Sequence, residues 1–180
     1  MTSKPTITTH NLLIHAVIFL LACWTLTTAS LVHATPEPIG KVLLSIGSNK
    51  AINTQGAERS LKRKSELYAG DTIQTAERGR VQIRFTDGSL LALKANARFA
   101  INEYKFDATA PNDGKAVYKL IKGGMRTVTG LIGREEKEDY SVATAVATIG
   151  IRGTHYSLFF CDAVCAQQTP SEQGLYGGVI

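Results

Sequence analysis

Short segments of alternating apolar and polar residues run through residues 41–160. In the stretch 80–85 every second residue is apolar, which gives one apolar and one polar face. Asp87-Gly88 follows at once, a pair typical of tight hairpin turns, and 89–93 returns as the second strand. Glycine-rich or polar turns separate the other expected strands, at 42–46, 99–106, 117–121, 125–128, 140–146, 147–151 and 155–160. This spacing predicts an all-β sandwich, barrel or solenoid.

One stretch, 57–70, has a mixed pattern. Its strong helix formers and its final glycine, Gly70, are typical of a helix. Leu61, Leu67 and Tyr68 do not form an apolar stripe along one helical face, however, and β segments lie on both sides. We therefore expect extended structure in this stretch.

The N-terminal residues 1–34 have the pattern of a secretory signal peptide. A single lysine precedes an uncharged apolar run, and small residues lead to a cleavage site after Ala34. Cleavage leaves a short linker, 35–39, ahead of one domain over 40–180, with no stable transmembrane span. The product is periplasmic or secreted. Two membrane-tethered alternatives stay open: an uncleaved signal anchor, and lipidation at Cys23, which follows a lipobox-like Leu-Leu-Ala.

The remaining cysteines favour an oxidising compartment. Cys161 and Cys165 are the two cysteines after the signal, and in such a compartment we expect them to pair. The rival is a metal pair with His155, the single histidine after the signal. Two thiols and one imidazole are too few ligands for a closed zinc site. We therefore predict a disulfide and no metal.

Charge and catalytic motifs exclude several function classes. The net charge is +5, and the run 62–64 is its one dense basic cluster, a pattern usual for a solvated face. Aromatic residues are not interleaved among the bases, so nucleic acid is not expected as a partner. His155 is the sole candidate general base after the signal, and no Gly-x-Ser-x-Gly or phosphate-binding loop accompanies it. We expect no enzyme activity, no catalytic residue and no cofactor.

Small and β-branched residues alternate in the stretch 143–154, where glycines bracket a single arginine. Gly150 and Gly153 indicate tight bends or close backbone approach on either side of Arg152. Arg152 is either a ligand-facing cation or a side chain that ties two turns together through backbone carbonyls. The same two interpretations apply to Arg126, and in both cases we favour the structural one.

Five elements, in order, resemble the FecR domain family. They are Gly40-Lys41-Val42, the segment Gly70 to Thr75, 81–85 with Asp87-Gly88, the G-x-R-x-x-T-G element from Gly124 to Gly130, and Ala147 to Thr154. The motif residues are Gly70, Asp71, Asp87, Gly88, Gly124, Arg126, Gly130, Gly150, Arg152, Gly153 and Thr154. The resemblance implies an all-β extracytoplasmic domain of many short strands with glycine-rich turns, either a β-roll or solenoid or a twisted sandwich. It implies no catalytic chemistry.

In FecR proteins proper, this domain lies in the periplasm beyond a membrane helix and relays the state of an outer-membrane receptor to a cytoplasmic sigma factor. Here about eleven residues precede the apolar segment, so we do not expect the sigma-regulating role. The resemblance instead implies a module for protein interaction or signal sensing in a Gram-negative envelope, with an envelope protein or outer-membrane component as its partner.

A carbohydrate or peptidoglycan ligand is the alternative, with Tyr104, Tyr118 and Tyr156 as residues that stack on sugars. The last residues, 174–180, have the pattern of an incomplete strand pair. Either the domain continues beyond them or another chain completes their strand.

Overall fold

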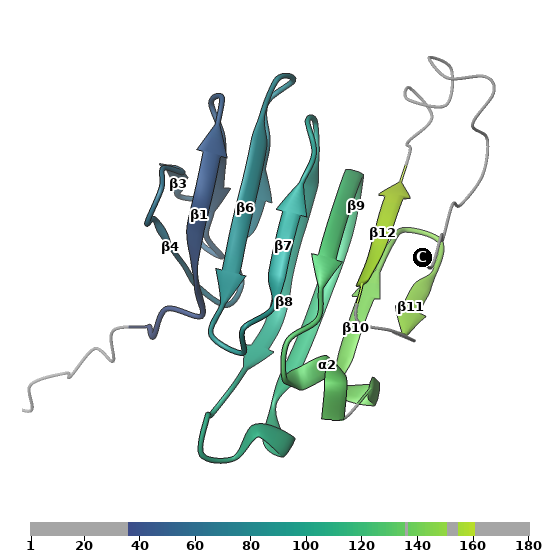
Figure 1. The fold of residues 1–180 in the computed structure, drawn as a ribbon. Helices are drawn as coiled ribbons and strands as arrows, with labels where there is room; N and C mark the ends of the chain where they lie inside the picture. The colour runs from purple at the N-terminus through teal and green to yellow at the C-terminus, as the bar shows by residue number, and fades with distance from the viewer. Residues whose placement is uncertain (1–35, 136, 151–154, 161–180) are drawn as a thin grey trace, which may run out of the picture. The chain divides into compact units, whose positions relative to one another are not determined.

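The computed structural model describes residues 36–135, 137–150 and 155–160, in which twelve strands form one continuous sheet (Figure 1). The strands are β1 (Gly40–Ile46), β2 (Lys50–Ile52), β3 (Glu58–Ser60), β4 (Glu66–Leu67), β5 (Thr72–Gln74), β6 (Arg80–Phe85), β7 (Leu90–Leu93), β8 (Arg98–Lys105), β9 (Lys115–Val128), β10 (Tyr140–Ala143), β11 (Thr148–Gly150) and β12 (His155–Phe160). Three helical turns complete the description, namely η1 (Pro111–Asp113), α2 (Ile132–Glu135) and η2 (Lys137–Asp139). The all-β expectation is confirmed.

Several predicted features lie outside the described residues. They are the signal peptide 1–34 with Cys23, the expected disulfide between Cys161 and Cys165, and the motif residues Arg152, Gly153 and Thr154. Of the helices in the described ranges, none is long and apolar enough to cross a membrane.

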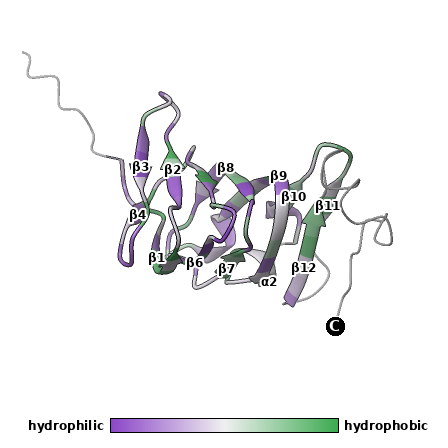
Figure 2. Ribbon diagram, turned by 90° about the horizontal axis from the view of Figure 1, so that it is seen from above, coloured by the Kyte–Doolittle hydropathy of each residue, from purple (hydrophilic) through white to green (hydrophobic). Residues whose placement is uncertain are grey.

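The long strand β9 joins the two layers of the fold. Its first half pairs with β8 and β10, and its second half pairs with β7 and β12. We call the strands β4-β1-β6-β7-β9-β12 sheet A and the strands β3-β2-β5-β8-β9-β10-β11 sheet B. The two layers lie on opposite sides of the interior when seen from above (Figure 2).

Two separate strands were expected around Gly123-Gly124, and this expectation is wrong. Gly123 has a φ of +83°, which an L-residue rarely adopts, and a Cβ there would lie 2.7 Å from the Cα of Ala97. The glycine therefore lets β9 bend from sheet B into sheet A without ending. A register shift between β8 and β9 accompanies the bend.

The core fills the space between the two layers. The apolar residues of β6 face inward, and the ring of Phe85 lies 5.5 Å from that of Tyr118, which belongs to the sheet B half of β9. Tyr118 also contacts Phe99 and Tyr140, at 5.2 and 5.4 Å between ring centroids. Offset and edge-on aromatic contacts of this kind add to the stabilisation from burial alone. The two layers are thus held together by one aromatic cluster.

The local predictions are mostly confirmed. The expected hairpin is β6 and β7, with Ile83 opposite Leu91. The mixed stretch 57–70 is extended, as β3 and β4 around a tight turn. The charged stretch 134–139 contains the end of α2 and the whole of η2. Ile132 is buried against Gly114 and anchors the first of these turns.

Four tyrosines with buried or half-buried side chains give the domain a predicted sensitivity to alkaline pH. Burial raises the pKa of Tyr104, Tyr118 and Tyr156 above the ordinary value, and raises the pKa of Tyr140 to about 12. The hydroxyl of Tyr156 donates to that of Tyr140 at 3.0 Å. Each folded-state pKa is raised, so the neutral side chains stabilise the fold fully below the unfolded pKa of about 10.

We therefore expect the free energy of unfolding to fall steeply as the pH rises from about 10 to about 12. Circular dichroism and tyrosinate absorbance recorded together should show ionisation and unfolding in one step, and Tyr140→Phe should make the pH dependence less steep. Tyr68 provides the comparison: its side chain is not buried in the core, and its pKa is raised mainly by the hydrogen bond to Glu66, so Tyr68→Phe should reduce the pH dependence less than Tyr140→Phe does. Reversible ionisation of all tyrosines near pH 10 in a folded protein would contradict the prediction.

Candidate interaction surface

The motif residue Asp71 is buried and paired. Its carboxylate is 1% exposed, and Arg59 of β3 donates to it twice, from Nη1 to Oδ1 at 2.9 Å and from Nη2 to Oδ2. The backbone N–H of Tyr68 donates to Oδ2 at 2.8 Å, and the guanidinium lies over the Tyr68 ring. Hydrogen bonding to Asp71 raises the pKa of Arg59 above its usual value. This group ties β3 to the turn between β4 and β5.

The motif residue Asp87 joins two family-like elements that are far apart in sequence. Its Oδ1 accepts from the Ser89 N–H at 3.0 Å, the Ser89 hydroxyl at 2.7 Å and the Tyr104 hydroxyl at 3.1 Å. Gly130 packs directly on this turn, because a Cβ there would lie 2.5 Å from both Asp87 O and Ser89 N. The N–H of Leu131 donates to Asp87 O at 3.0 Å. Asp87 and Gly130 therefore serve the architecture.

The other described motif residues lie around the two sheets. Gly88 adopts a φ of +84° in the hairpin turn, and Gly70 adopts +86° ahead of β5. Gly124 lies beneath the side chains of Phe159 and Lys94, which fill the space a Cβ would need, whereas Gly150 ends β11 in open space.

Arg126 differs from the other motif residues. Its side chain is exposed on the outer face of sheet A, and within the described part of the chain it has no hydrogen bond or ion pair. Of the charged motif residues in the described ranges, namely Asp71, Asp87 and Arg126, it is the exposed one.

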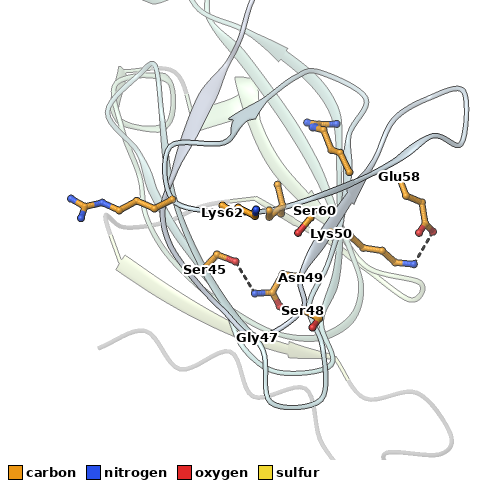
Figure 3. A pocket seen from close by; sticks show the side chains of 11 residues that line it. Ser45, Gly47, Ser48, Asn49, Lys50, Glu58, Ser60 and Lys62 are labelled. Carbon is orange, nitrogen blue, oxygen red and sulfur yellow. Dashed lines mark hydrogen bonds and ion pairs between the residues drawn. The ribbon is translucent and has the colours of Figure 1, made fainter.

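A polar groove of about 620 Å³ lies beside the corner between β1 and β2 (Figure 3). At the corner itself, the side-chain amide of Asn49 donates to Ser45 Oγ at 3.0 Å and to Ile46 O at 2.7 Å, and its oxygen accepts from Ala76 N–H at 3.1 Å. Lys50 pairs with Glu58 at 2.7 Å across β2 and β3. Asn49, Lys50 and Glu58 thus use their polar groups within the protein, while Lys62 and Arg63 of the lining form no ion pair within the described residues.

The outer face of sheet A carries a second, smaller groove that is mostly apolar. It has a volume of about 150 Å³ and is lined by Leu43 of β1, Leu90 and Ala92 of β7, and Arg126 and Val128 of β9. A cross-strand row places Ala92 opposite Arg126 and Arg126 opposite Ser157, so the groove lies one strand away from β12.

Within the described ranges, β12 is one of the two edges of sheet A, and β4 is the other. Among the described residues β12 pairs with β9 alone. Its sequence, His-Tyr-Ser-Leu-Phe-Phe, contains no lysine, acid, glycine or proline, and its second half is strongly hydrophobic (Figure 2). Leu158 is buried in the core, while Phe159 is 44% exposed on the outer face. Edge strands are usually protected by charge, proline or a bulge, and β12 has none of these.

Other candidate chemistry is not assembled in the described part of the chain. In residues 36–135, 137–150 and 155–160, no three His, Cys, Asp or Glu side chains come together as a metal site. Of the tyrosines named for sugar stacking, Tyr104 and Tyr118 are buried in the core, and Tyr156 is half-buried with its hydroxyl on Tyr140.

The model of the family described as "FecR protein" matches residues 71–179. The chain belongs to the FecR family. The matched span of this FecR protein begins at Asp71 and includes β5 to β12, with Asp87, Arg126 and Gly150. Strands β1 to β4 lie before the matched span, but β1 belongs to the same sheet because it pairs with β6.

A solved chain described as "Cell surface anchoring domain" is similar to this FecR protein. The two are 29% identical, with a TM-score of 0.34, and the match covers 34% of this chain and 82% of that chain. No curated protein matches the sequence.

Sequence reasoning missed the partners of the motif residues. Ser89 had a local signal, since an aspartate two residues before a serine is typical of a side-chain-stabilised turn. Arg59 and Tyr104 had none, because the aspartates that they contact lie 12 and 17 residues away and meet them only after the sheets form.

Proposed function

We propose that this FecR protein is a non-enzymatic interaction module of the bacterial cell envelope, which binds a protein partner by strand addition along β12. The signal-like N-terminus and the family support the envelope location. The open edge of β12 is the observation that carries the mode of binding.

Strand addition suits this edge for a physical reason. An added strand forms main-chain hydrogen bonds along β12, and these give affinity whatever the partner's side chains are. Specificity comes from alternate side chains of the partner, which would lie over the outer face beside Ser157 and Phe159. One strand further in, Arg126 and the apolar groove of about 150 Å³ offer a cation and an apolar contact.

The carbohydrate alternative has less support. Sugar binding by stacking needs exposed aromatic faces. Tyr104 and Tyr118 instead contribute to the aromatic cluster between the sheets. No contact of the described residues favours a sugar over a protein partner.

The proposal is tested by photo-crosslinking in the cells that make the protein. A photoreactive phenylalanine at Phe159, on β12, should yield one discrete crosslinked species in the envelope fraction. The same probe at Thr148 should yield none, because Thr148 is also exposed but lies on β11, the edge of sheet B. Mass spectrometry of the crosslinked species identifies the partner segment.

A blocking variant strengthens this test. Ser157→Lys adds a charge to the edge, which disfavours strand addition, and should abolish the crosslink at 159 while circular dichroism remains native. Equal crosslinking from positions 148 and 159, no crosslink from either, or a crosslink unaffected by Ser157→Lys would contradict the proposal.

A further inference from the structure

The outer face of sheet A combines exposed apolar side chains with cations that have no acidic partner. The exposed apolar side chains are Leu43, Leu44, Ile46 and Phe159, with the half-buried Leu90 and Val128 beside them, and the cations are Arg80, Arg84, Lys94 and Arg126. Of the described residues on this face, Glu66 is the one acid, and Lys41 pairs with it at 3.6 Å. This composition is unusual for a solvated sheet face, where both signs of charge are normally mixed.

The strand register interleaves the two kinds of side chain. At one end of the sheet, Ile46 of β1 is opposite Arg80 of β6. At the same end, Lys94 lies beside Gly124, because its N–H donates to Gly124 O, and Gly124 is opposite Phe159 of β12. Neighbouring strands are about 4.8 Å apart, so each of these cations is about one strand spacing from a residue with an apolar side chain or from its neighbour.

A second row repeats this arrangement near the other end of the sheet. Arg84 is opposite Leu90, and Leu90 is opposite Val128, so a cation again stands beside apolar side chains. The pattern therefore extends over the face rather than being confined to one corner.

The outer faces of the two sheets differ in their apolar side chains more than in their cations. On sheet B, Lys50 pairs with Glu58 and Lys115 pairs with Glu103 at 3.0 Å, while the exposed Lys105 and Lys119 form no ion pair within the described residues. The large apolar side chains that are exposed on the described strands all lie on sheet A. In the part of the chain that the structure describes, Arg80, Arg84 and Arg126 form no ion pair. Their charge is available to an anionic partner.

We propose that the outer face of sheet A binds the surface of an anionic phospholipid bilayer. The apolar side chains insert among the lipid headgroups, and the arginines and Lys94 lie at the level of the phosphates. The groove of about 150 Å³ is too small to enclose a sizeable ligand, whereas the exposed apolar groups are spread from β1 to β12. An extended face with interleaved cations fits a planar, negatively charged surface better than a single bound molecule.

Vesicle co-sedimentation tests this proposal with the protein as recovered from the cell. We expect binding to vesicles of phosphatidylglycerol and phosphatidylcholine at low salt, much weaker binding at high salt, and little binding to phosphatidylcholine alone. Arg80→Gln with Arg84→Gln, both on β6 and three strands from β12, should lower the partition coefficient about 30-fold, at about 1 kcal/mol per cation. The matched control is Lys105→Gln with Lys115→Gln, which removes the same charge from an exposed pair opposite each other on β8 and β9 of sheet B, and should change binding little.

The apolar contribution has its own matched pair. Ile46→Ser should weaken binding several-fold, whereas Leu131→Ser, at an equally exposed leucine away from this face, should not. Equal losses in test and control variants, equal binding to neutral vesicles, or competition by soluble polyphosphate as effective as that by anionic vesicles would overturn the proposal. Ile46 and Arg80 lie three or more strands from β12, so this outcome is independent of strand addition there.

Discussion

Gly130→Ala is expected to lower the free energy of unfolding by about 3 kcal/mol or more, although the substitution adds a single methyl group. The added Cβ would lie 2.5 Å from Asp87 O and from Ser89 N, and closer still to Asp87 Oδ2. Two of these three are backbone atoms of a hairpin turn, which cannot rotate away as the end of a flexible side chain can. The substitution must therefore separate the Asp87 turn from the end of β9.

Gly150→Ala is the matched control, because a Cβ at Gly150 meets nothing within 4 Å. Thermal and urea unfolding should show a large loss for Gly130→Ala and a change below about 1 kcal/mol for Gly150→Ala. If the Gly130 variant does not accumulate, limited proteolysis in cell extracts gives the same comparison. Equal stability of the two variants would show that the contact between Asp87 and Gly130 is not close-packed.

Breaking the buried pair between Arg59 and Asp71 is expected to be the second most damaging change. Arg59→Met leaves the Asp71 carboxylate buried with one remaining donor, the N–H of Tyr68. Loss of one partner from a buried pair costs about 3 to 5 kcal/mol, and we expect about 2 to 3 kcal/mol because a third of the Arg59 side chain is exposed.

A double-mutant cycle measures this directly. Arg59→Met combined with Asp71→Leu should be less destabilising than the sum of the two single changes, since the buried charge is then gone. Lys50→Met serves as the control, because it removes a cation from the exposed Lys50–Glu58 pair on the neighbouring strand and should cost less than about 1 kcal/mol. Additive effects of the Arg59 and Asp71 changes would contradict the account.

Both predictions concern motif residues, and this bears on what the family pattern represents. Asp71, Asp87 and Gly130 hold turns and strand ends together. Arg126 alone among the described charged motif residues is exposed. Most of the described motif residues therefore maintain the scaffold, and apart from Arg126 the proposed contact surfaces are formed by residues outside the motif.

Local features of the fold were predictable from the sequence, whereas long-range features were not. The β6–β7 hairpin follows from alternation and a turn pair, both of which act within a dozen residues. The passage of β9 through Gly123 depends on the distant Ala97 backbone, so the glycine pair alone looked like a strand end. Similarly, the short α2 turn depends on the packing of the Ile132 side chain against Gly114.

The candidate surface was predictable only in part. Alternation marks 155–160 as a strand and the family pattern marks Arg126, but neither indicates that β12 lies at a sheet edge. Edge position is a property of strand order, which loop lengths and local propensity do not determine. Likewise, Arg80 and Arg84 come from β6, Lys94 from the loop after β7 and Arg126 from β9, and only the register brings them to one face.

Amide hydrogen exchange at β12 tests the central claim most directly, first in the free protein and then with the crosslinking partner added. The account predicts that alternate amides of β12, those pointing away from β9, exchange fast in the free protein and become protected in the complex. The amides of β6, at the centre of sheet A, should be slow in both states. Slow exchange of every β12 amide in the free protein, or unchanged exchange on adding the partner, would contradict an open edge that binds by strand addition.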